Sequence, residues 1–235
     1  MSIQDNIARI RERISEAAVR VGRNPDSVTL MAVSKTVEPE RIRRAYAAGI
    51  RVFGENRVQE FADKTSALKD LAQAEWHLIG HLQSNKANRA AELFHAVDSI
   101  DSLRLAQKLN QAAQQSGKIL PVLIEINVGG EESKSGVSAS SPELETILQG
   151  LQGLGHLQTR GLMTIPPYTE DPAGARAHFR MLHELRAQIA ARALPRIQMD
   201  VLSMGMSHDF EVAIEEGSTC IRVGTAIFGQ RPKPQ

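Results

Sequence analysis

The sequence has one cysteine, few aromatic residues and almost no excess charge of either sign, and each shortage excludes a class of protein. Cys220 is the only cysteine among 235 residues, so the chain can form no internal disulfide and has no cysteine cluster for structural zinc. Aromatic residues make up 4% of the chain and leave few side chains on which bases could stack. With 28 Lys+Arg against 27 Asp+Glu, no strong general attraction to nucleic acid is expected. A protein of a reducing compartment that binds no nucleic acid and no metal fits best.

Long apolar runs and a secretory leader are also missing. No stretch approaches the roughly 18 apolar residues that a membrane span needs, and residues 1–6 lack a basic region followed by an apolar core. The composition, 42% hydrophobic and 23% charged, is typical of a globular protein. We therefore expect a cytoplasmic protein without a membrane partner, long enough for one large domain or two small ones.

What is present is an alternation of short apolar runs with amphipathic stretches. Residues 3–21 place apolar side chains at steps of four and three, which predicts a helix that ends at Gly22. Residues 27–34 are rich in β-forming side chains and predict a buried strand. Further apolar runs are centred near Val52, Leu78, Val97, Ile124, Gly161, Val201 and Ile221, and stretches long enough for helices include residues 39–48, 58–71, 103–113 and 175–193.

This pattern predicts an α/β fold, a single-domain (β/α)8 TIM barrel with an extra N-terminal helix. A doubly wound open sheet is the alternative, but no Gly-x-Gly-x-x-Gly fingerprint follows the first strand. We assign residues 1–230 to one barrel domain with a loop at 129–141, and residues 231–235 to a frayed tail.

Active sites of such barrels lie where the strands end, and Lys35 closes the first predicted strand. Strand alternation places Lys35 on the face of Met31 and Val33, which would line the barrel interior. A desolvated lysine loses its charge readily, and its amine can form a Schiff base with a carbonyl. The alternative is a lysine whose ammonium group extends from the strand end into solvent.

Two segments near the C-terminus predict a phosphate site. After the seventh strand, a glycine turn leads into a helix expected to begin near Ser207, whose hydroxyl and neighbouring N–H groups can hold a phosphate; Ser207 as a simple N-cap is the alternative. After the last strand, Gly224 permits close approach of a phosphate and Thr225 adds a hydroxyl. Arg222 shares the face of Gly224 and should point inward, unless it forms an ion pair with a neighbouring carboxylate. Together these residues predict a site for a phosphate-bearing carbonyl compound.

Several blocks of sequence follow one another in the order found in one known family. They are residues 32–36, 53–60, 77–86, 133–136, 160–163, 203–207 and 222–229. In these blocks, and over nearly its whole length, the chain resembles the pyridoxal phosphate homeostasis proteins. The resemblance implies the barrel of alanine racemase-like proteins, which is fold type III among pyridoxal phosphate proteins. It also implies binding of pyridoxal 5′-phosphate (PLP) without a well-established catalytic activity.

The resemblance further implies which residues bind the cofactor. The matching positions are Lys35, Asn56, Ser207, Arg222, Gly224 and Thr225. Lys35 would form the Schiff base, Arg222 would face the pyridine nitrogen, and the hydroxyl and glycine positions would hold the phosphate. Because an arginine does not give up its proton at ordinary pH, the pyridine would stay unprotonated and the ring would be a weak electron sink. Such a site suits storage and delivery of the cofactor better than broad carbanion chemistry.

Function hypotheses from different classes follow. The first is a monomeric, non-catalytic carrier that acts in intracellular PLP homeostasis and supplies PLP-dependent apoenzymes. The second is a PLP-dependent amino-acid racemase or related enzyme, which needs an opposing base supplied by a further domain; the chain ends soon after Arg222 and leaves no room for one. Cys220 could substitute as that base, although a lone cysteine within a strand is usually a core residue. A phosphate-binding barrel without cofactor would leave Lys35 unexplained. His81 is expected to cap a loop.

Overall fold

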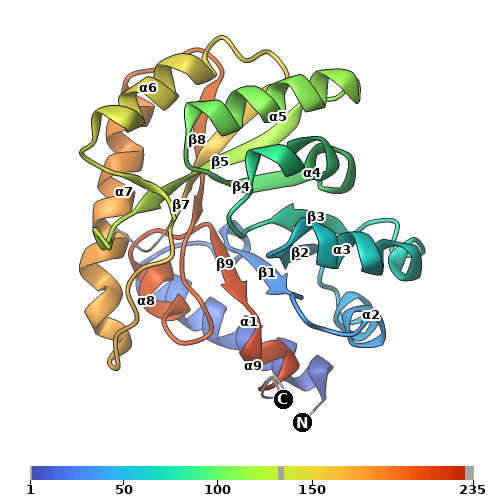
Figure 1. Ribbon diagram of the computed structural model, residues 1–235. Helices are drawn as coiled ribbons and strands as arrows, with labels where there is room; N and C mark the ends of the chain where they lie inside the picture. Colours follow the sequence, from blue (N-terminus) through green and yellow to red (C-terminus); the bar gives the residue numbers. More distant parts are fainter. Residues whose placement is uncertain (1, 132–134, 231–235) are drawn as a thin grey trace.

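The computed structural model describes residues 2–131 and 135–230 and shows a closed barrel of eight parallel strands (Figure 1). The barrel strands are β1 (Thr29–Val33), β2 (Val52–Glu55), β3 (Glu75–Leu78), β4 (Ala96–Ile100), β5 (Leu120–Asn127), β7 (Leu157–Met163), β8 (Ile197–Ser203) and β9 (Cys220–Val223). Each pairs in parallel with its neighbours, and the pairings β1–β9 and β4–β5 close the ring. The predicted barrel is confirmed, and the open sheet is excluded.

Helices alternate with these strands and cover the outside of the barrel. They are α1 (Ile3–Arg20), α2 (Pro39–Ala47), α3 (Val58–Thr65), α4 (Ala87–Leu93), α5 (Leu103–Gln115), α6 (Pro142–Leu151), α7 (Arg176–Ala191), α8 (Phe210–Glu215) and α9 (Thr225–Phe228). The helix predicted for residues 3–21 is confirmed, and Ser2 caps it by accepting the N–H of Asp5 at 3.1 Å. No described helix combines the length and apolar character of a bilayer span.

Three local expectations differ from the structure. The helix after β8 begins at Phe210 and not near Ser207. The segment predicted to be a loop at 129–141 contains the two-residue strand β6 (Val137–Ser138), which pairs with β5 outside the barrel. The stretch predicted as helix at 58–71 divides into α3 and a separate 3-10 turn, Ser66–Leu68. The tail at 231–235 and residues 133 and 134 of one sequence block lie outside the described residues.

Each barrel strand has one face toward the helices and one toward the barrel interior. Outward-facing side chains such as Ala32 and Phe53 belong to the main core beneath the helices. A small separate cluster contains Met31, Val33 and Cys220 and lies inside the ring. Because side chains alternate along a strand, residues in phase with this inner cluster face the barrel interior.

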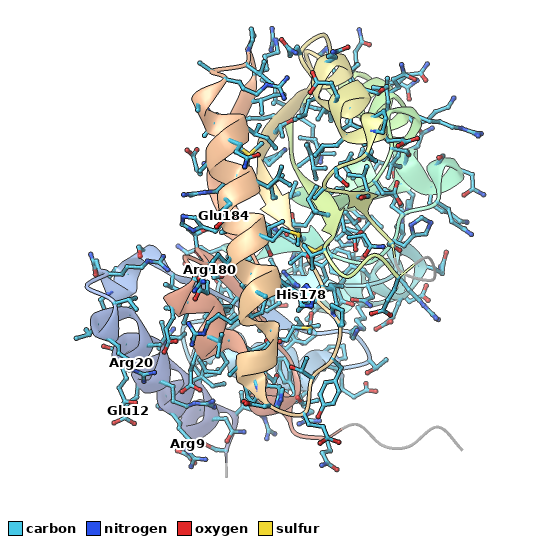
Figure 2. The ribbon with its side chains drawn as sticks, turned by 90° about the vertical axis from the view of Figure 1, so that its left-hand side faces the viewer. Arg9, Glu12, Arg20, His178, Arg180 and Glu184 are labelled. Carbon is cyan, nitrogen blue, oxygen red and sulfur yellow. The ribbon has the colours of Figure 1, made fainter. Side chains whose placement is uncertain are left out.

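The extra helix α1 is fastened to the C-terminal part of the chain. Glu215 of α8 accepts hydrogen bonds from Arg20 of α1 at 2.5 Å and from Arg176 of α7 at 2.6 Å. The amide of Asn6 donates to the carbonyl of Ile227 in α9 at 2.9 Å. Figure 2 shows α1 and α7 on one face of the molecule. These contacts hold α1 against the β9–β1 side of the barrel, beside the end of β1 that bears Lys35.

Candidate functional site

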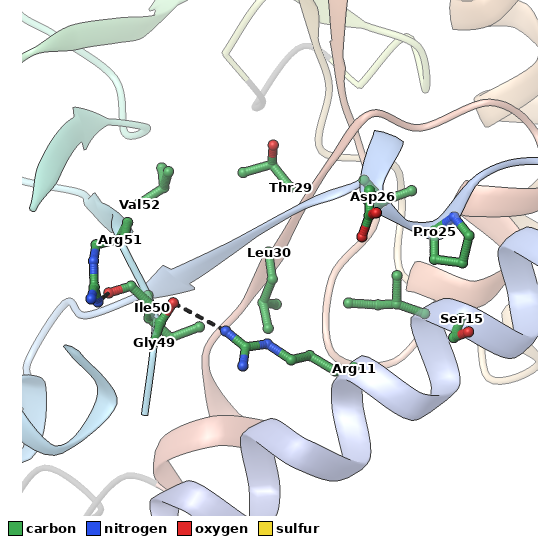
Figure 3. A pocket seen from close by; sticks show the side chains of 12 residues that line it. Arg11, Ser15, Pro25, Asp26, Thr29, Leu30, Gly49, Ile50, Arg51 and Val52 are labelled. Atoms are coloured by element: carbon green, nitrogen blue, oxygen red, sulfur yellow. Dashed lines mark hydrogen bonds between the residues drawn. The ribbon is translucent and has the colours of Figure 1, made fainter. Parts of the chain in front are cut away.

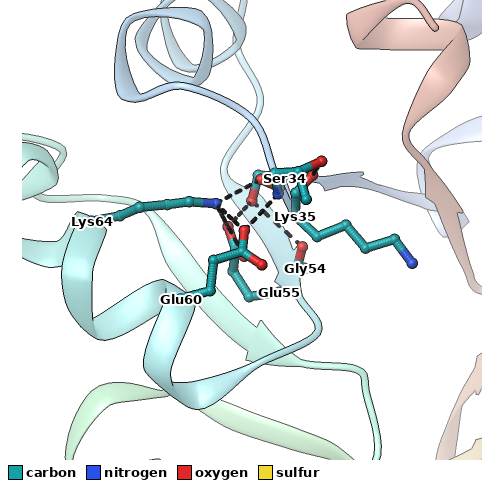
Figure 4. A network of polar contacts seen from close by, with 7 residues as sticks. Ser34, Lys35, Gly54, Glu55, Glu60 and Lys64 are labelled. Atoms are coloured by element: carbon teal, nitrogen blue, oxygen red, sulfur yellow. Dashed lines mark hydrogen bonds and ion pairs between the residues drawn. The ribbon is translucent and has the colours of Figure 1, made fainter. Parts of the chain in front are cut away.

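Lys35 lies in a turn two residues after the end of β1, at the C-terminal end of the barrel where the sequence placed it. It is half-buried and in phase with Met31 and Val33, which are 0% and 9% exposed. Its side chain points away from a polar network that surrounds its backbone (Figure 4). Lys35 is therefore placed at the mouth of the barrel, just beyond the end of its strand.

The network holds the chain on both sides of Lys35 (Figure 4). On one side, Ser34 Oγ donates to Glu55 Oε1 at 2.7 Å. On the other, the N–H of Thr36 donates to Glu60 Oε1 at 2.5 Å, and Thr36 has a left-handed φ of 60°. Lys64 Nζ joins both halves, because it donates to Glu60 at 2.7 Å and to the carbonyl of Ser34 at 3.0 Å. Sequence reasoning did not single out this support for Lys35.

The two carboxylates of the network differ in protonation preference. Burial raises the pKa of Glu55, whose side chain is 0% exposed, and Lys64 and Ser34 oppose the rise. For Glu60, burial also acts to raise the pKa, but hydrogen bonds from Lys64 and Thr36 outweigh it and the pKa lies below its usual value. Lys64 thus provides the positive charge that stabilises both carboxylates.

The loops after β8 and β9 meet at Ser207. Its Oγ accepts the backbone N–H groups of Gly224 at 3.3 Å and Ala226 at 3.4 Å. Thr225, between them, is exposed. The alternative of Ser207 as a simple N-cap is wrong, because Asp209 occupies the N-cap position of α8. The predicted phosphate residues are therefore brought together, with the Ser207 hydroxyl against two backbone amides at one end of the barrel.

Arg222 is buried inside the barrel, with 3% of its surface exposed. Its Nη1 donates to Ser203 Oγ at 2.8 Å and its Nη2 to the carbonyl of Thr164 at 2.6 Å. Burial lowers the pKa of the guanidinium, and the nearby acidic groups oppose this effect. The alternative of an ion pair is wrong within the described part of the chain, since these bonds go to uncharged oxygens. The guanidinium is thus hydrogen-bonded to neutral groups, while Asp98, Glu125 and Asp209 act on its charge from further away.

Glu125 is a buried acid that sequence reasoning missed. It lies on β5 in register with Met163, which is in turn in register with Ser203. It is 4% exposed, and its Oε2 has no hydrogen-bond partner among the described residues. Burial raises its pKa to about 7; Asp101 adds to the rise and Arg222 opposes it. The available signal was a carboxylate inside an otherwise apolar strand.

A half-buried histidine paired with a buried aspartate, also missed, lies between neighbouring strands. His77 Nδ1 of β3 is 3.1 Å from Asp98 Oδ2 of β4. Burial acts to lower the pKa of His77, but the charge and hydrogen bond of Asp98 outweigh it and the pKa is raised.

Cys220 lies in the same interior, and burial raises its pKa to about 12. A thiol with such a pKa stays protonated at neutral pH, which argues against its use as a base.

Asn56 follows β2 at the same end of the barrel as Lys35. Its backbone packs so closely on Gly80 that a Cβ at Gly80 would lie 2.3 Å from the carbonyl oxygen of Asn56. His81, next along the chain, is exposed, and its Nδ1 lies 3.1 Å from Asp101 Oδ2. Asn56 lines a cavity of about 320 Å³ between the segments that follow β2 and β3.

A larger cavity of about 540 Å³ lies at the opposite end of the barrel (Figure 3). Thr29 and Val52, the first residues of β1 and β2, line it beside α1. Arg11 projects into it and donates to the carbonyl of Gly49 at 3.0 Å. Since this end is remote from Lys35 and Ser207, the chemistry predicted from the sequence belongs to the other mouth.

The arrangement at that mouth combines an amine, a set of phosphate donors and a buried guanidinium. No group of three or more His, Cys, Asp or Glu side chains among residues 2–131 and 135–230 could hold a metal ion. An amine can condense with a carbonyl, and backbone N–H groups can hold a phosphate, so the arrangement suits an organic ligand that carries both groups.

Comparison with known proteins agrees with this chemistry. The alanine racemase N-terminal domain family matches residues 2–232. A relative from Aquifex aeolicus (strain VF5), named pyridoxal phosphate homeostasis protein, is 46% identical over 98% of this chain and 99% of its own length.

Solved structures show the same fold. PipY of Synechococcus elongatus PCC7942, solved with PLP bound, has a TM-score of 0.80 at 40% identity, over 94% of this chain and all of PipY. An alanine racemase of Clostridium difficile 630 has a TM-score of 0.72 at 14% identity, and the match covers 99% of this chain but 57% of the racemase. The likeness to the racemase concerns the barrel alone.

Proposed function

Because the chain belongs to the family of pyridoxal phosphate homeostasis proteins, built on the alanine racemase N-terminal barrel, we propose that it binds PLP and acts in intracellular homeostasis of this cofactor. The single observation that supports this most is the convergence of Ser207 with the backbone amides of Gly224 and Ala226 at the barrel end where Lys35 lies. PLP is a phosphate-bearing aldehyde, and such a ligand needs both a phosphate cradle and an amine.

The residues present fit the cofactor. The N–H groups of Gly224 and Ala226, together with the hydroxyls of Ser207 and Thr225, would hold the phosphate. The buried Arg222 would face the pyridine nitrogen, and Asn56 would lie beside the ring. When bound, PLP supplies an aldehyde that can condense with the Lys35 amine to a Schiff base.

The residues around the site favour a carrier over an enzyme. Arg222 keeps its proton, so it would hold the pyridine nitrogen in its neutral form. The interior Cys220 thiol stays protonated because of its raised pKa. Tyr168 is 78% exposed, and the ring of Tyr46 lies 4.2 Å from the guanidinium of Arg51 on the barrel exterior. These groups offer no base opposite Lys35, so we propose storage and delivery of PLP without turnover, in the cytoplasm, by a monomer that supplies PLP-dependent apoenzymes.

Covalent trapping tests the binding proposal. The protein purified with its cofactor is treated with borohydride, digested and mapped by mass spectrometry. We expect the reduced cofactor on Lys35 and no visible absorbance band in Lys35→Ala. Lys108→Ala, which changes an exposed lysine of α5, should behave like the parent protein. Equal covalent retention of PLP by Lys35→Ala would contradict the proposal.

A chirality assay tests the absence of turnover. The cofactor-loaded protein is incubated with L- and D-amino acids, and enantiomeric composition is followed by chiral chromatography. We expect no change beyond that of free PLP. Sustained conversion of any amino acid, abolished by Lys35→Ala, would instead favour the racemase alternative.

A further inference from the structure

We infer that the cavity between the segments after β2 and β3 is an anion-binding subsite that takes the carboxylate of an α-amino acid and so places its amine at the barrel mouth near Lys35. The inference rests on the proposed function for the role of that amine. The subsite itself is argued from the side chains around the cavity and requires no cofactor.

The lining of this cavity is basic and polar. Its volume is about 320 Å³, which lies at the small end of the range for small-molecule sites. The lining residues are Asn56, Arg57, Val58, Gln59, His81, Leu82, Gln83 and Lys86. They include basic side chains and side-chain amides but no carboxylate, a donor-rich composition that suits a small anion.

The two permanent cations of the lining are not neutralised within the described chain. Neither Arg57 nor Lys86 forms an ion pair there, whereas many surface arginines do; Arg43, for example, lies 2.7 Å from Asp70. Arg57 acts on Glu60 only as a minor influence on its pKa, and the Glu60 carboxylate is already bound by Lys64. An anion in the cavity would thus meet two cationic side chains that form no ion pair within the described residues.

His81 contributes less to this charge. Its Nδ1 lies 3.1 Å from Asp101, which is itself outside the lining. The argument for an anion therefore depends on Arg57 and Lys86. Lys86 ends the short 3-10 turn Ser84–Lys86, which leads directly into α4, so its backbone is held at the cavity.

The cavity at the other end of the barrel provides a contrast. It also contains arginines, but their guanidinium groups are bound to the chain. Arg11 donates to the carbonyl of Gly49 at 3.0 Å (Figure 3). Arg51 donates to the carbonyls of Tyr46 and Ile50 at 2.8 Å. Size alone would favour that cavity, but its basic groups have structural partners.

The strand register places the proposed subsite one strand away from the end of β1, which Lys35 follows. Val33 of β1 is paired with Gly54 of β2, and Gly54 is paired with His77 of β3. The ends of these strands are therefore adjacent, at a spacing of about 4.8 Å per strand. Asn56, which we place beside the cofactor, also lines the cavity. A carboxylate bound by Arg57 and Lys86 thus leaves the attached amine within a short reach of the barrel mouth.

The subsite predicts a preference for amino acids over simple amines. An amine without a carboxylate gains nothing from Arg57 and Lys86, whereas an α-amino acid is held at the mouth by its carboxylate. Binding at this subsite would link the release of stored cofactor to the supply of amino acids.

Titration of the cofactor-free protein tests the subsite directly. ¹⁵N-labelled protein is titrated with propionate, L-alanine, ethylamine and inorganic phosphate, and backbone shifts of residues 56–59 and 81–86 are followed. We expect saturable shifts with propionate and L-alanine and none with ethylamine. The double variant Arg57→Gln/Lys86→Gln should bind propionate and L-alanine at least tenfold more weakly. The control variant Lys108→Gln should bind both ligands as the parent protein does.

The outcomes distinguish the possible ligands. If inorganic phosphate binds these residues and the carboxylates do not, the cavity is a phosphate site and the amino-acid assignment is wrong. Equal shifts with ethylamine, or shifts unchanged in the double variant, would overturn the anion subsite altogether. None of these titrations depends on PLP. The subsite proposal can therefore be contradicted while borohydride labelling of Lys35 supports the proposed function, and the labelling can be negative while the titrations support the subsite.

A second measurement tests the consequence for the loaded protein. Loss of the bound-cofactor absorbance is followed after addition of L-alanine or ethylamine at the same pH and at equal concentrations of the unprotonated amine. We expect L-alanine to act several-fold faster, and the preference to disappear in Arg57→Gln while the starting spectrum stays unchanged. Equal rates for the two amines in the parent protein would contradict the placement near Lys35.

Discussion

At the scale of single residues, the site depends on polar groups that face into the barrel. Arg222 is satisfied by Ser203 and the carbonyl of Thr164, whereas the Oε2 atom of Glu125 has no partner among the described residues. Leaving a carboxylate unpaired in the interior is costly when it is charged, and protonation removes most of this cost. Glu125 should therefore make the stability of the protein depend on pH.

The direction follows from the raised pKa of Glu125, about 7 in the folded protein against an ordinary 4.5. The folded state binds the Glu125 proton more tightly than the unfolded state does. The contribution of this proton to the free energy of unfolding is therefore fully present below pH 4.5 and is lost as pH rises through 7. At about 1.4 kcal/mol per pKa unit, the loss is about 3 kcal/mol. Glu125→Gln should remove this dependence. Urea unfolding of the cofactor-free protein measures this effect. Relative to the parent, the free energy of unfolding of the variant should increase between pH 5 and pH 8; a difference that does not change with pH would contradict the raised pKa of Glu125.

At the scale of elements, α3 fixes the end of β1. Glu60 and Lys64 lie on successive turns of α3 and bind the chain on either side of Lys35. Lys64 also contacts the fully buried Glu55 at 3.2 Å. Helix α3 thus determines where the backbone of Lys35 lies, although α3 contributes no side chain to the proposed cofactor site.

Replacing Lys64 with methionine tests this role. Lys64→Met leaves Glu55 and the carbonyl of Ser34 without their positive partner, which should cost about 3 kcal/mol near neutral pH. The cost should shrink as pH falls, because loss of Lys64 raises the pKa of Glu55 and protonation relieves the buried charge. Denaturant titrations at pH 8 and pH 5 measure both effects, and PLP titration should show weaker binding. Lys69→Met, an exposed change on the same side of the barrel, is the matched control. Equal stability of the two variants would exclude the proposed role.

At the scale of the whole molecule, closure of the barrel requires close backbone approach between β7 and β8. Gly161 lies where the register of β7 shifts against both of its neighbours. A Cβ at this position would lie 1.8 Å from the carbonyl oxygen of Val201. Glycine in a strand interior commonly marks such an approach, and here it lets the strands that carry Met163 and Ser203 come into register.

Gly161→Ala should therefore disturb the barrel as a whole. The methyl group forces β7 and β8 apart, with an expected cost of at least about 2–3 kcal/mol. Gly155→Ala, where a Cβ would meet nothing within 4 Å, is the control. Thermal unfolding monitored by circular dichroism compares the two. If Gly161→Ala were as stable as Gly155→Ala, the close approach of β7 and β8 would not require glycine at position 161.

The order of strands and helices was predictable from the sequence because hydrophobic periodicity is a local property. The runs centred near Val52, Leu78 and Ile124 became β2, β3 and β5, and Lys35 follows β1 as expected. Ser207 was also a candidate, but the start of the following helix was not predicted correctly. Capping and turn geometry depend on neighbours outside the local sequence.

By itself, the sequence determined which segments alternate and which polar residues follow the strands. The tertiary structure alone decided that Ser207 meets the amides of Gly224 and Ala226, that Arg222 is held by Ser203, and that Glu125 Oε2 has no hydrogen-bond partner among the described residues. Ser207 and Gly224, like Ser203 and Arg222, come together because β8 pairs with β9, and closure of the ring encloses Glu125 of β5 in the same interior. Ring closure also removes the inner strand faces from water, and this desolvation gives the enclosed charges their altered pKa values.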